Sequence, residues 1–247
     1  MGDDLAALAR RMIPLIDLTS LNDDDDEKRI ARLCAAATTP FGAVAAVCIY
    51  GRFVAAARQR LEGGAVRIAS VANFPAGTAT VAQTVEEVRR LIADGADEVD
   101  VVIPYARFLS GEDGPARDLH VACRDACGSA TTLKAILETG AYGEDRARIS
   151  AAAELAISAG ANFIKTSTGK IAVGATPLAA GCILEAIRRG GAPVGFKASG
   201  GIRDAAQAGA YLALAGRIMG PHWARPRTFR FGVSRLLDDL VARLKAV

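Results

Sequence analysis

Short apolar segments alternate with longer amphipathic segments along the whole chain. The short segments are rich in β-branched residues, as in VRIASVAN at 66–73 and EVDVVIP at 98–104. Segments of this length and composition predict buried strands. The eight predicted strands span residues 13–18, 46–50, 66–73, 98–104, 132–138, 163–168, 194–199 and, on the least regular pattern, 217–220.

The longer segments carry apolar residues at three- and four-residue spacing, as Val81, Val85 and Val88 do within 79–94. The predicted helices span 24–37, 52–62, 79–94, 115–127, 144–159, 177–189, 203–215 and 232–245. Eight strand–helix repeats predict an α/β fold with a parallel sheet closed into a (β/α)8 barrel, preceded by a short N-terminal helix. An open doubly wound sheet fits less well because it usually has about five or six strands. Since no linker interrupts the pattern, we expect residues 1–247 to form one domain.

Composition narrows the class of protein. Hydrophobic residues make up 51% of the chain, charged residues 23%, and the net charge is +3, as in an ordinary soluble globular protein. The densest basic patch, RPRTFR at 225–230, is too short to predict nucleic-acid binding. No apolar run reaches the length of a membrane span, and the acidic, amphipathic start of the chain resembles no targeting peptide. We therefore expect a cytoplasmic protein without a nucleic-acid or membrane partner.

Two patterns suggest a metal, and each has a simpler interpretation. Cys123 and Cys127 are four residues apart on a predicted helix, but no histidine lies within three residues of Cys127, which favours packing in the core. An odd total of five cysteines without an export signal predicts free thiols. The acidic run NDDDDEKR at 22–29 is better explained as a helix start, where Asn22 or Asp23 can cap. No metal site is predicted, and no Walker or dinucleotide loop is present.

Polar residues recur at positions that point into the predicted barrel. With a period of two along each strand, the polar inward-facing residues are Asp17, Cys48, Asp100, Lys134, Lys165 and Lys197. A single buried lysine is usually an ion-paired structural residue. Six strands that each direct such a group into one interior favour a functional site, and barrel active sites lie at the C-terminal ends of the strands.

Two lysines and a carboxylate in one pocket favour chemistry on a carbonyl group. Free lysine has a pKa of about 10.4, whereas the nucleophile is the neutral amine. Two ammonium groups roughly 4 Å apart repel by about 4 kcal/mol, which corresponds to a pKa depression of roughly three units. Lys165 or Lys197 is then free to form a Schiff base, with Asp100 as the general acid/base or as the group that positions a water. Alternatively, the lysines bind an anion without covalent chemistry.

Three glycine-containing loops predict a phosphate site. SGGIRD at 199–204 follows the seventh strand, and RFGVS at 230–234 is expected to open the last helix, so backbone amides at both can bind an anion. TGK at 168–170 lies nearby, and the seventh and eighth loops are the usual phosphate site of such barrels. Plain helix capping is the alternative for each loop. The predicted phosphate-binding residues are Gly169, Lys170, Gly200, Gly201, Gly232 and Ser234.

Eight segments, in chain order, carry a resemblance to a known family: IDLTSLNDDDDEK, VCIY, VANFPAGT, GADEVDVVIPY, LKAILETG, GANFIKTSTGK, GFKASGGIRD and FGVSRLL. Together they resemble the deoxyribose-phosphate aldolases over nearly the whole chain. The resemblance implies a class I aldolase that reversibly cleaves 2-deoxy-D-ribose 5-phosphate to D-glyceraldehyde 3-phosphate and acetaldehyde. It also implies a role in deoxyribose phosphate catabolism, no metal or organic cofactor, and a homodimer.

The resemblance assigns a role to each matching residue. Lys165 would form the Schiff base, Lys197 would lower its pKa, and Asp100 would relay protons. The six glycine-loop residues named above would hold the phosphate. The sugar pocket would be lined by Asp17, Thr19, Leu21, Cys48 and Thr166.

The chain departs from the family pattern at three places. Ala198–Ser199 replaces the usual Pro-Ala, and Arg235 stands where a second serine often follows Ser234, either adding charge to the phosphate site or facing solvent. The chain stops at Val247 without the C-terminal tyrosine tail of some members, so we expect lower activity or a proton relay that rests on Asp100 and water. The alternatives are a Schiff-base aldolase with a different acceptor and a sugar-phosphate-binding barrel without catalysis.

Overall fold

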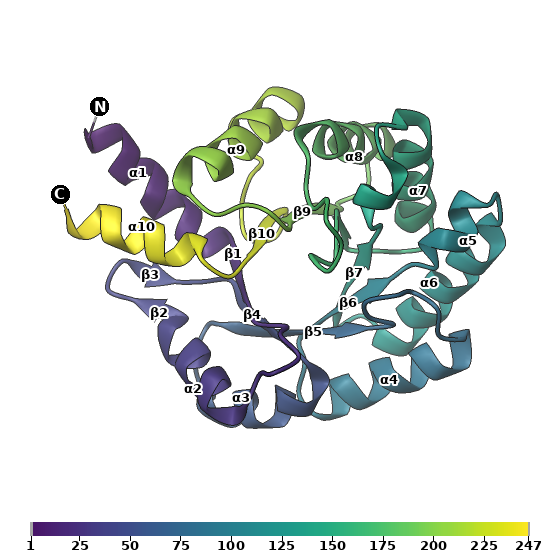
Figure 1. Cartoon of the computed structure of the whole chain (residues 1–247), viewed down its shortest axis with the longest axis horizontal. Helices are drawn as coiled ribbons and strands as arrows, with labels where there is room; N and C mark the ends of the chain where they lie inside the picture. The colour runs from purple at the N-terminus through teal and green to yellow at the C-terminus, as the bar shows by residue number, and fades with distance from the viewer. Residues whose placement is uncertain (1, 247) are drawn as a thin grey trace.

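Eight parallel strands form a closed barrel in the computed structural model, which describes residues 2–246 (Figure 1). Each strand pairs with the next along the chain, and the last pairs with the first. This arrangement confirms the predicted (β/α)8 barrel. The barrel strands are β1 (Ile16–Thr19), β4 (Ala46–Ile49), β5 (Arg67–Ala72), β6 (Glu98–Val102), β7 (Thr132–Ile136), β8 (Phe163–Lys165), β9 (Gly195–Ser199) and β10 (Phe229–Val233).

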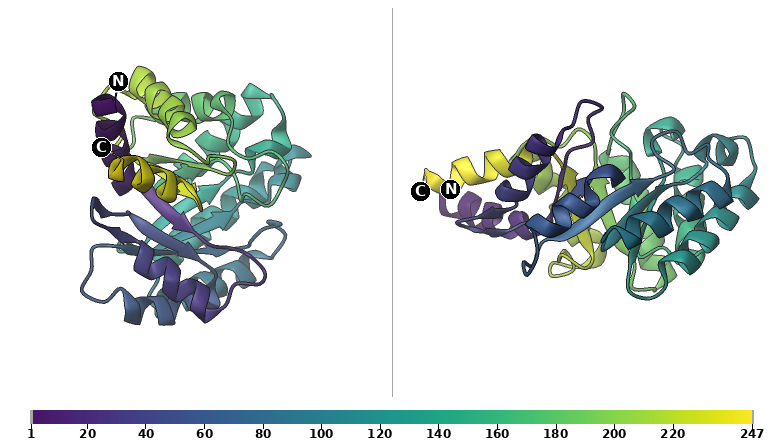
Figure 2. Two further views of the ribbon diagram at one scale, coloured as in Figure 1. Left: turned by 60° about the vertical axis from the view of Figure 1, so that its left-hand side comes forward. Right: turned by 90° about the horizontal axis from the view of Figure 1, so that it is seen from below.

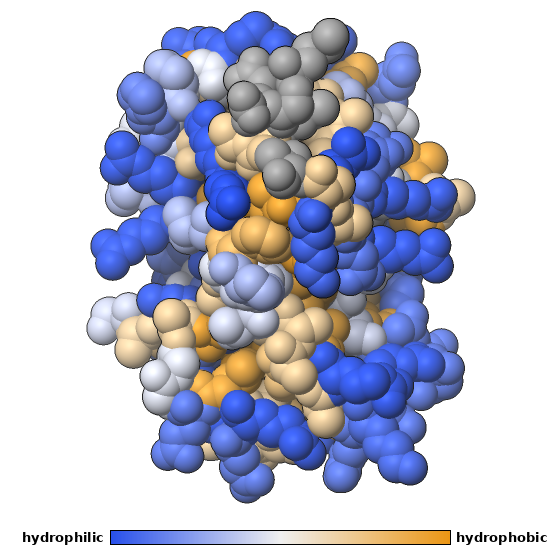
Figure 3. All heavy atoms as spheres, turned by 90° about the vertical axis from the view of Figure 1, so that its left-hand side faces the viewer, coloured by the Kyte–Doolittle hydropathy of each residue, from blue (hydrophilic) through white to orange (hydrophobic). Residues whose placement is uncertain are grey.

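Helices surround the barrel on its outer side (Figure 1). They are α1 (Gly2–Met12), α2 (Glu27–Ala36), α3 (Val54–Arg60), α4 (Val81–Ala93), α5 (Tyr105–Leu109), α6 (Asp113–Cys127), α7 (Arg146–Ser158), α8 (Pro177–Gly190), α9 (Ala205–Met219) and α10 (Leu236–Lys245). The predicted N-terminal helix is α1, which lies beside α10 (Figure 2). A band of apolar surface runs between charged side chains on this face of the molecule (Figure 3). Among the helices of residues 2–246, none is long and apolar enough to span a membrane.

The main core lies between the barrel and the helices. Strand β6 shows how alternation builds it: Val99 and Val101 point outward and are fully buried beneath the helices, whereas Asp100 points into the barrel. Cys123 and Cys127 are buried in the same outer layer, which confirms their packing role. In residues 2–246, no group of three or more His, Cys, Asp or Glu side chains is placed to hold a metal ion.

The acidic run at 22–29 begins a helix, as predicted, but three residues later than expected. The N-terminal cap of α2 is Asp26, whose carboxylate accepts a hydrogen bond from the Arg29 backbone N–H at 2.7 Å. Asp24 and Asp25 instead form ion pairs with the Arg29 guanidinium. Asp24 and Asp25 therefore lie before the helix, with their carboxylates bound to the Arg29 side chain.

The predicted eighth strand at 217–220 is wrong, because Arg217–Met219 form the end of α9. The strand is β10 at Phe229–Val233, and the last helix begins at Leu236 rather than at 232. In β10 the outward residues are Phe229, Phe231 and Val233, which pack in the main core. A charged residue, Arg230, is the second residue of this strand and interrupts its apolar pattern. The short hairpin β2 (Thr38–Thr39) and β3 (Gly42–Ala43), helix α5 and the 3-10 turns η1 (Ile13–Leu15), η2 (Gly51–Phe53) and η3 (Thr139–Tyr142) were not predicted.

Candidate active site

The barrel interior holds four cationic and three anionic side chains, all at most 4% exposed. They are Asp17 from β1, Glu98 and Asp100 from β6, Lys134 from β7, Lys165 from β8, Lys197 from β9 and Arg230 from β10. A charge without a partner would be very costly at this depth. Each of the seven contacts at least one opposite charge, so the interior is one continuous ion network.

Asp100 is the centre of the upper part of the network. Its Oδ2 accepts hydrogen bonds from Lys165 Nζ and Lys197 Nζ, both at 2.8 Å. Lys165 and Lys197 are register partners on neighbouring strands, which is why both ammonium groups reach the same oxygen. The other oxygen, Oδ1, accepts from Lys134 Nζ at 2.7 Å. The structure thus brings Lys165, Lys197 and Asp100 together and places Lys134, also predicted to face inward, against the same carboxylate.

Asp17, Glu98 and Arg230 form the lower part of the network. Asp17 accepts from Lys197 Nζ at 2.5 Å and from Arg230 Nη1 at 2.5 Å. Glu98 accepts from Arg230 Nη2 at 3.0 Å and lies 2.6 Å from Lys134 Nζ. Asp17 therefore supports the lysines from below, whereas the resemblance assigned it to the sugar pocket. Glu98 and Arg230 were missed, although Glu98 is two residues before Asp100 and so shares its inward face.

The three buried lysines differ in how easily they lose a proton. Burial lowers the pKa of Lys165, the positive charge of Lys197 lowers it further, and Asp100 opposes both. Burial also acts on Lys134 and Lys197, but their carboxylate partners outweigh it and raise the pKa of each. When Lys165 is neutral, three cations face three carboxylates. Lys165 is therefore the lysine that can lose its proton within the network. Burial lowers its pKa more than the repulsion from Lys197 does.

An apolar wall of the barrel interior lies beside the lysines. Cys48 on β4 is fully buried and packs with Leu21, Ala69 and Val71. Burial raises the pKa of the Cys48 thiol, which keeps it neutral. The wall adds to the low polarity that lowers the pKa of Lys165.

A cavity of about 450 Å³ opens at the C-terminal ends of the strands. The six residues predicted to bind phosphate all line it, together with Thr19 and Leu21. Gly200 and Gly201 both have φ +87°, a left-handed conformation that glycine adopts without strain. Gly232 lies inside β10 rather than at a helix start, and Ser234 follows that strand. The cationic side chains at the cavity are Lys170, Arg203 and Arg235, so Arg235 adds charge there.

Two polar residues near the cavity mainly hold the loops in place. The Thr166 hydroxyl donates to the Ser199 carbonyl at 3.2 Å and accepts from the Ser199 N–H at 3.0 Å, and it does not line the cavity. Glu138, at the end of β7, is fully buried with φ +60° and accepts hydrogen bonds from the Thr168 N–H and hydroxyl. Burial raises the pKa of Glu138. Sequence reasoning missed Glu138, since a left-handed glutamate has no local signature.

Comparison with known proteins gives one consistent result. Residues 11–238 match the DeoC/LacD family of aldolases. A candidate deoxyribose-phosphate aldolase from Coccidioides immitis is 30% identical with a TM-score of 0.80, over 94% of this chain and 85% of that one. One from Toxoplasma gondii is 25% identical with a TM-score of 0.91, over 99% of both chains. The tetrameric deoxyribose phosphate aldolase from Aeropyrum pernix shares the fold, with 24% identity and a TM-score of 0.78 over 100% of this chain and 96% of that one.

Proposed function

The chain belongs to the DeoC/LacD aldolase family, and we propose that it reversibly cleaves 2-deoxy-D-ribose 5-phosphate to D-glyceraldehyde 3-phosphate and acetaldehyde. The reaction would proceed through a Schiff base on Lys165. The observation that carries this proposal is the placement of Lys165, whose only carboxylate partner in the buried network is Asp100 at 2.8 Å, so that its pKa is lowered whereas the pKa values of Lys134 and Lys197 are raised. A neutral amine at the C-terminal end of a barrel strand is the nucleophile that this chemistry requires.

In the cleavage direction, the Lys165 amine adds to the substrate aldehyde, and loss of water gives a protonated imine. The imine accepts the electron pair of the breaking carbon–carbon bond, while the 3-hydroxyl proton leaves and the first aldehyde product forms. Protonation of the remaining enamine and addition of water release acetaldehyde and restore the Lys165 amine. The water lost in the first step is regained in the last.

The proton transfers would depend on Asp100 and Lys197 together. The three lysines outweigh burial and hold the pKa of Asp100 well below its usual range, so its carboxylate is ionised and only weakly basic. This favours a role for Asp100 in positioning Lys197 and a water over a role as the sole base. The Lys197 ammonium, which donates to the same Asp100 oxygen as Lys165 Nζ, is then the candidate proton donor.

The cavity at the strand ends supports a phosphorylated substrate. It carries Lys170, Arg203 and Arg235, with backbone amides of glycine loops beside them. Gly232 connects the cavity to the network, because a Cβ at this position would lie 2.9 Å from Lys197 Cε. A substrate phosphate in this cavity therefore leaves the aldehyde end directed toward the lysines.

The direct test is an assay of 2-deoxy-D-ribose 5-phosphate cleavage with purified protein. We expect activity in the wild type, no measurable activity in Lys165→Arg, which keeps the charge but not the nucleophile, and wild-type activity in Lys28→Arg on the exposed side of α2. A Lys165→Arg variant with substantial activity would contradict the proposal. In the reverse, carbon–carbon bond-forming direction, activity with unphosphorylated acceptor aldehydes but not with D-glyceraldehyde 3-phosphate would favour an aldolase with a different acceptor.

We also infer that the protein acts in the cytoplasm as a homodimer. The resemblance of the sequence supports the dimer, and the apolar band beside α1 and α10 is a surface that a second copy can cover (Figure 3). The tetramer from Aeropyrum pernix makes four copies the alternative. Light scattering coupled to size-exclusion chromatography would give twice the chain mass for a dimer, and any other mass would refute it.

A further inference from the structure

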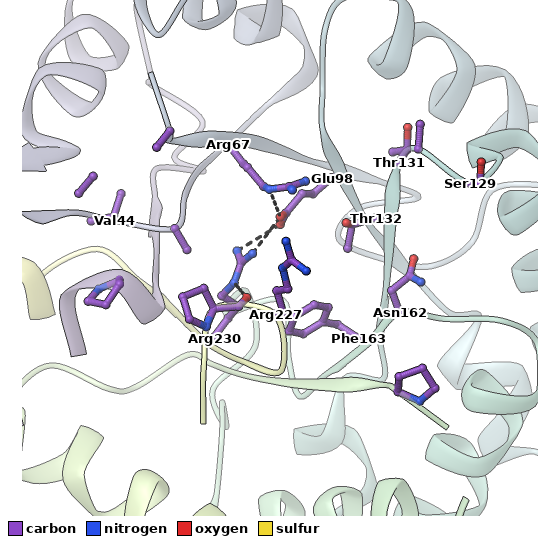
Figure 4. Close-up of a pocket in the computed structure, with 17 residues that line it drawn as sticks. Val44, Arg67, Glu98, Ser129, Thr131, Thr132, Asn162, Phe163, Arg227 and Arg230 are labelled. Atoms are coloured by element: carbon purple, nitrogen blue, oxygen red, sulfur yellow. Dashed lines mark hydrogen bonds and ion pairs between the residues drawn. The ribbon is translucent and has the colours of Figure 1, made fainter. Parts of the chain in front are cut away.

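A second cavity, of about 500 Å³, lies at the opposite end of the barrel from the proposed phosphate site. We call it the basal cavity (Figure 4). Its wall includes Arg67, Glu98, Thr132 and Phe163, each the first residue of its strand. Active sites of such barrels lie at the other end, so the proposed reaction gives this cavity no role.

Three arginines face the basal cavity around one carboxylate. Figure 4 shows the side chains of Arg67, Arg227 and Arg230 gathered near Glu98. Arg230 Nη2 donates to Glu98 Oε1 at 3.0 Å, and Arg67 Nε lies 3.9 Å from the same oxygen. Within residues 2–246, the Arg227 side chain forms no hydrogen bond or ion pair. Arg230 is already paired with both Glu98 and Asp17, so the uncompensated positive charge at the cavity is that of Arg67 and Arg227.

Glu98 cannot neutralise this excess, because it also serves the ion network inside the barrel. Its Oε2 lies 2.6 Å from Lys134 Nζ. Arg230 is fixed from several sides: it donates to Asp17 and to the Pro226 carbonyl, both at 2.5 Å, and lies over the Phe163 ring. Arg230 is only 4% exposed, so it is a preorganised part of the wall, whereas Arg67 and Arg227 are exposed and can adjust.

The remaining lining supplies neutral hydrogen-bonding groups. Ser129, Thr131, Thr132 and Asn162 lie along the β7 and β8 side of the cavity (Figure 4). Guanidinium groups bind phosphate-like oxyanions through paired hydrogen bonds, and hydroxyl or amide groups complete such sites. The cavity, of about 500 Å³, has room for a ligand larger than a single phosphate. Arg67 and Arg227 lie on its solvent-exposed side.

We infer that the basal cavity binds a multiply charged oxyanion of the phosphate class, such as a small phosphorylated metabolite, through Arg67, Arg227 and Arg230. The ion network separates this site from the cavity at the other end of the barrel. A ligand in the basal cavity therefore leaves the entrance for the aldolase substrate open.

Calorimetric titration with pyrophosphate at low ionic strength tests the inference. We expect two sites in the wild type, one at each end of the barrel. Arg67→Gln/Arg227→Gln should weaken one site roughly a hundredfold, since each lost charged hydrogen bond is worth about tenfold in affinity, and should leave the other unchanged. Lys170→Gln/Arg203→Gln, at the other cavity, should weaken the second site only.

Arg89→Gln/Arg217→Gln is the matched control, because it removes the same charge from two exposed positions outside both cavities. This control should titrate like the wild type. The inference is overturned if Arg67→Gln/Arg227→Gln titrates like the wild type, or if the control loses as much affinity. Should the double variant not fold, Arg227→Gln alone breaks no hydrogen bond or ion pair within residues 2–246 and should still weaken the basal site about tenfold. Aldolase activity without pyrophosphate should stay at the wild-type level in Arg227→Gln, because this side chain forms no ion pair with the network and does not line the cavity at the C-terminal strand ends.

Discussion

At the scale of single residues, the site depends on which of three buried lysines gives up its proton. All three share Asp100, yet only Lys165 has a lowered pKa, because Lys134 and Lys197 each have a second carboxylate within reach. Asp100 itself cannot satisfy three full charges. The lysine with a single carboxylate partner is the one that can be neutral, and it is the one at which carbonyl chemistry would start.

Replacing Lys197 with leucine should shift Schiff-base formation to higher pH. The change removes a positive charge near Lys165 and leaves Asp100 and Asp17 less neutralised, and both effects raise the pKa of Lys165. We expect the pH of half-maximal acetaldehyde trapping to rise by about one unit or more, and the trapping rate at neutral pH to fall about tenfold. A pH profile identical to that of the wild type would show that Lys197 does not influence Lys165.

Replacing Arg230 with methionine should destabilise the protein. Asp17 and Glu98 would each lose a buried partner, which typically costs about 3–5 kcal/mol in the free energy of unfolding. Arg243→Met removes a solvent-exposed ion pair with Asp239 and should change the free energy of unfolding far less. Urea denaturation measures both, and equal losses would mean that the buried network adds no stability.

The sequence indicated the upper part of this network, but of the lower part only Asp17. Lys165, Lys197 and Asp100 were predictable because strand alternation and family resemblance agreed on them. The support from Glu98 and Arg230 depends on the register between β6 and β10, which lie far apart in the barrel order. No local pattern specifies which inward side chains meet across a barrel, so these ion pairs required the structure.

At the scale of elements, β9 and β10 connect the lysines to the cavity at the C-terminal strand ends, which we call the phosphate cavity. Lys197 lies on β9, and Ser199 and Gly232 line the cavity. A Cβ on Gly232 would lie 2.7 Å from Ser199 Oγ and 2.9 Å from Lys197 Cε. We expect Gly232→Ala to displace Lys197 and lower kcat/KM about tenfold, in line with the cost of overpacking. Gly181→Ala on α8, with no atom within 4 Å of the added methyl, should keep wild-type activity. Equal kcat/KM in both variants would contradict this placement.

Strand β10 also shows where sequence patterns fail at this scale. The other seven strands overlap segments that the sequence predicted as strands, but β10, with an arginine and a glycine at its two inward positions, was missed. Its identity depends on the aromatic residues Phe229 and Phe231, which pack against each other, and Phe229 also packs against Phe196 of β9. The inward residues Arg230 and Gly232 therefore made β10 hard to identify as a strand from its sequence.

At the scale of the whole molecule, one buried histidine should make stability depend on pH. His120 on α6 is fully buried with neither ring nitrogen bonded to a described residue, and burial lowers its pKa from 6.5 to about 4. Between these values the unfolded chain binds a proton that the folded chain does not, so stability should fall by about 3 kcal/mol as the pH drops from 6.5 to 4. His120→Leu should remove this dependence, as urea denaturation across that pH range would show. An unchanged pH slope would contradict it.

The overall architecture was predictable because a barrel repeats one pattern eight times, so that an error in one strand did not alter the count. The two cavities differ in how far the sequence predicted them, although each is built from residues that are far apart along the chain. The phosphate cavity was anticipated through its glycine loops. The basal cavity has no such signature, and its arginines appear in the sequence only as separate charges.

Borohydride trapping with acetaldehyde tests the central claim most directly. The protein is incubated with acetaldehyde, reduced, digested and mapped by mass spectrometry. We expect a stable ethyl group on Lys165, absent in Lys165→Arg and formed more slowly in Lys197→Leu. A folded protein that acquires no adduct at Lys165, or acquires it at another buried lysine, would contradict the Schiff-base mechanism.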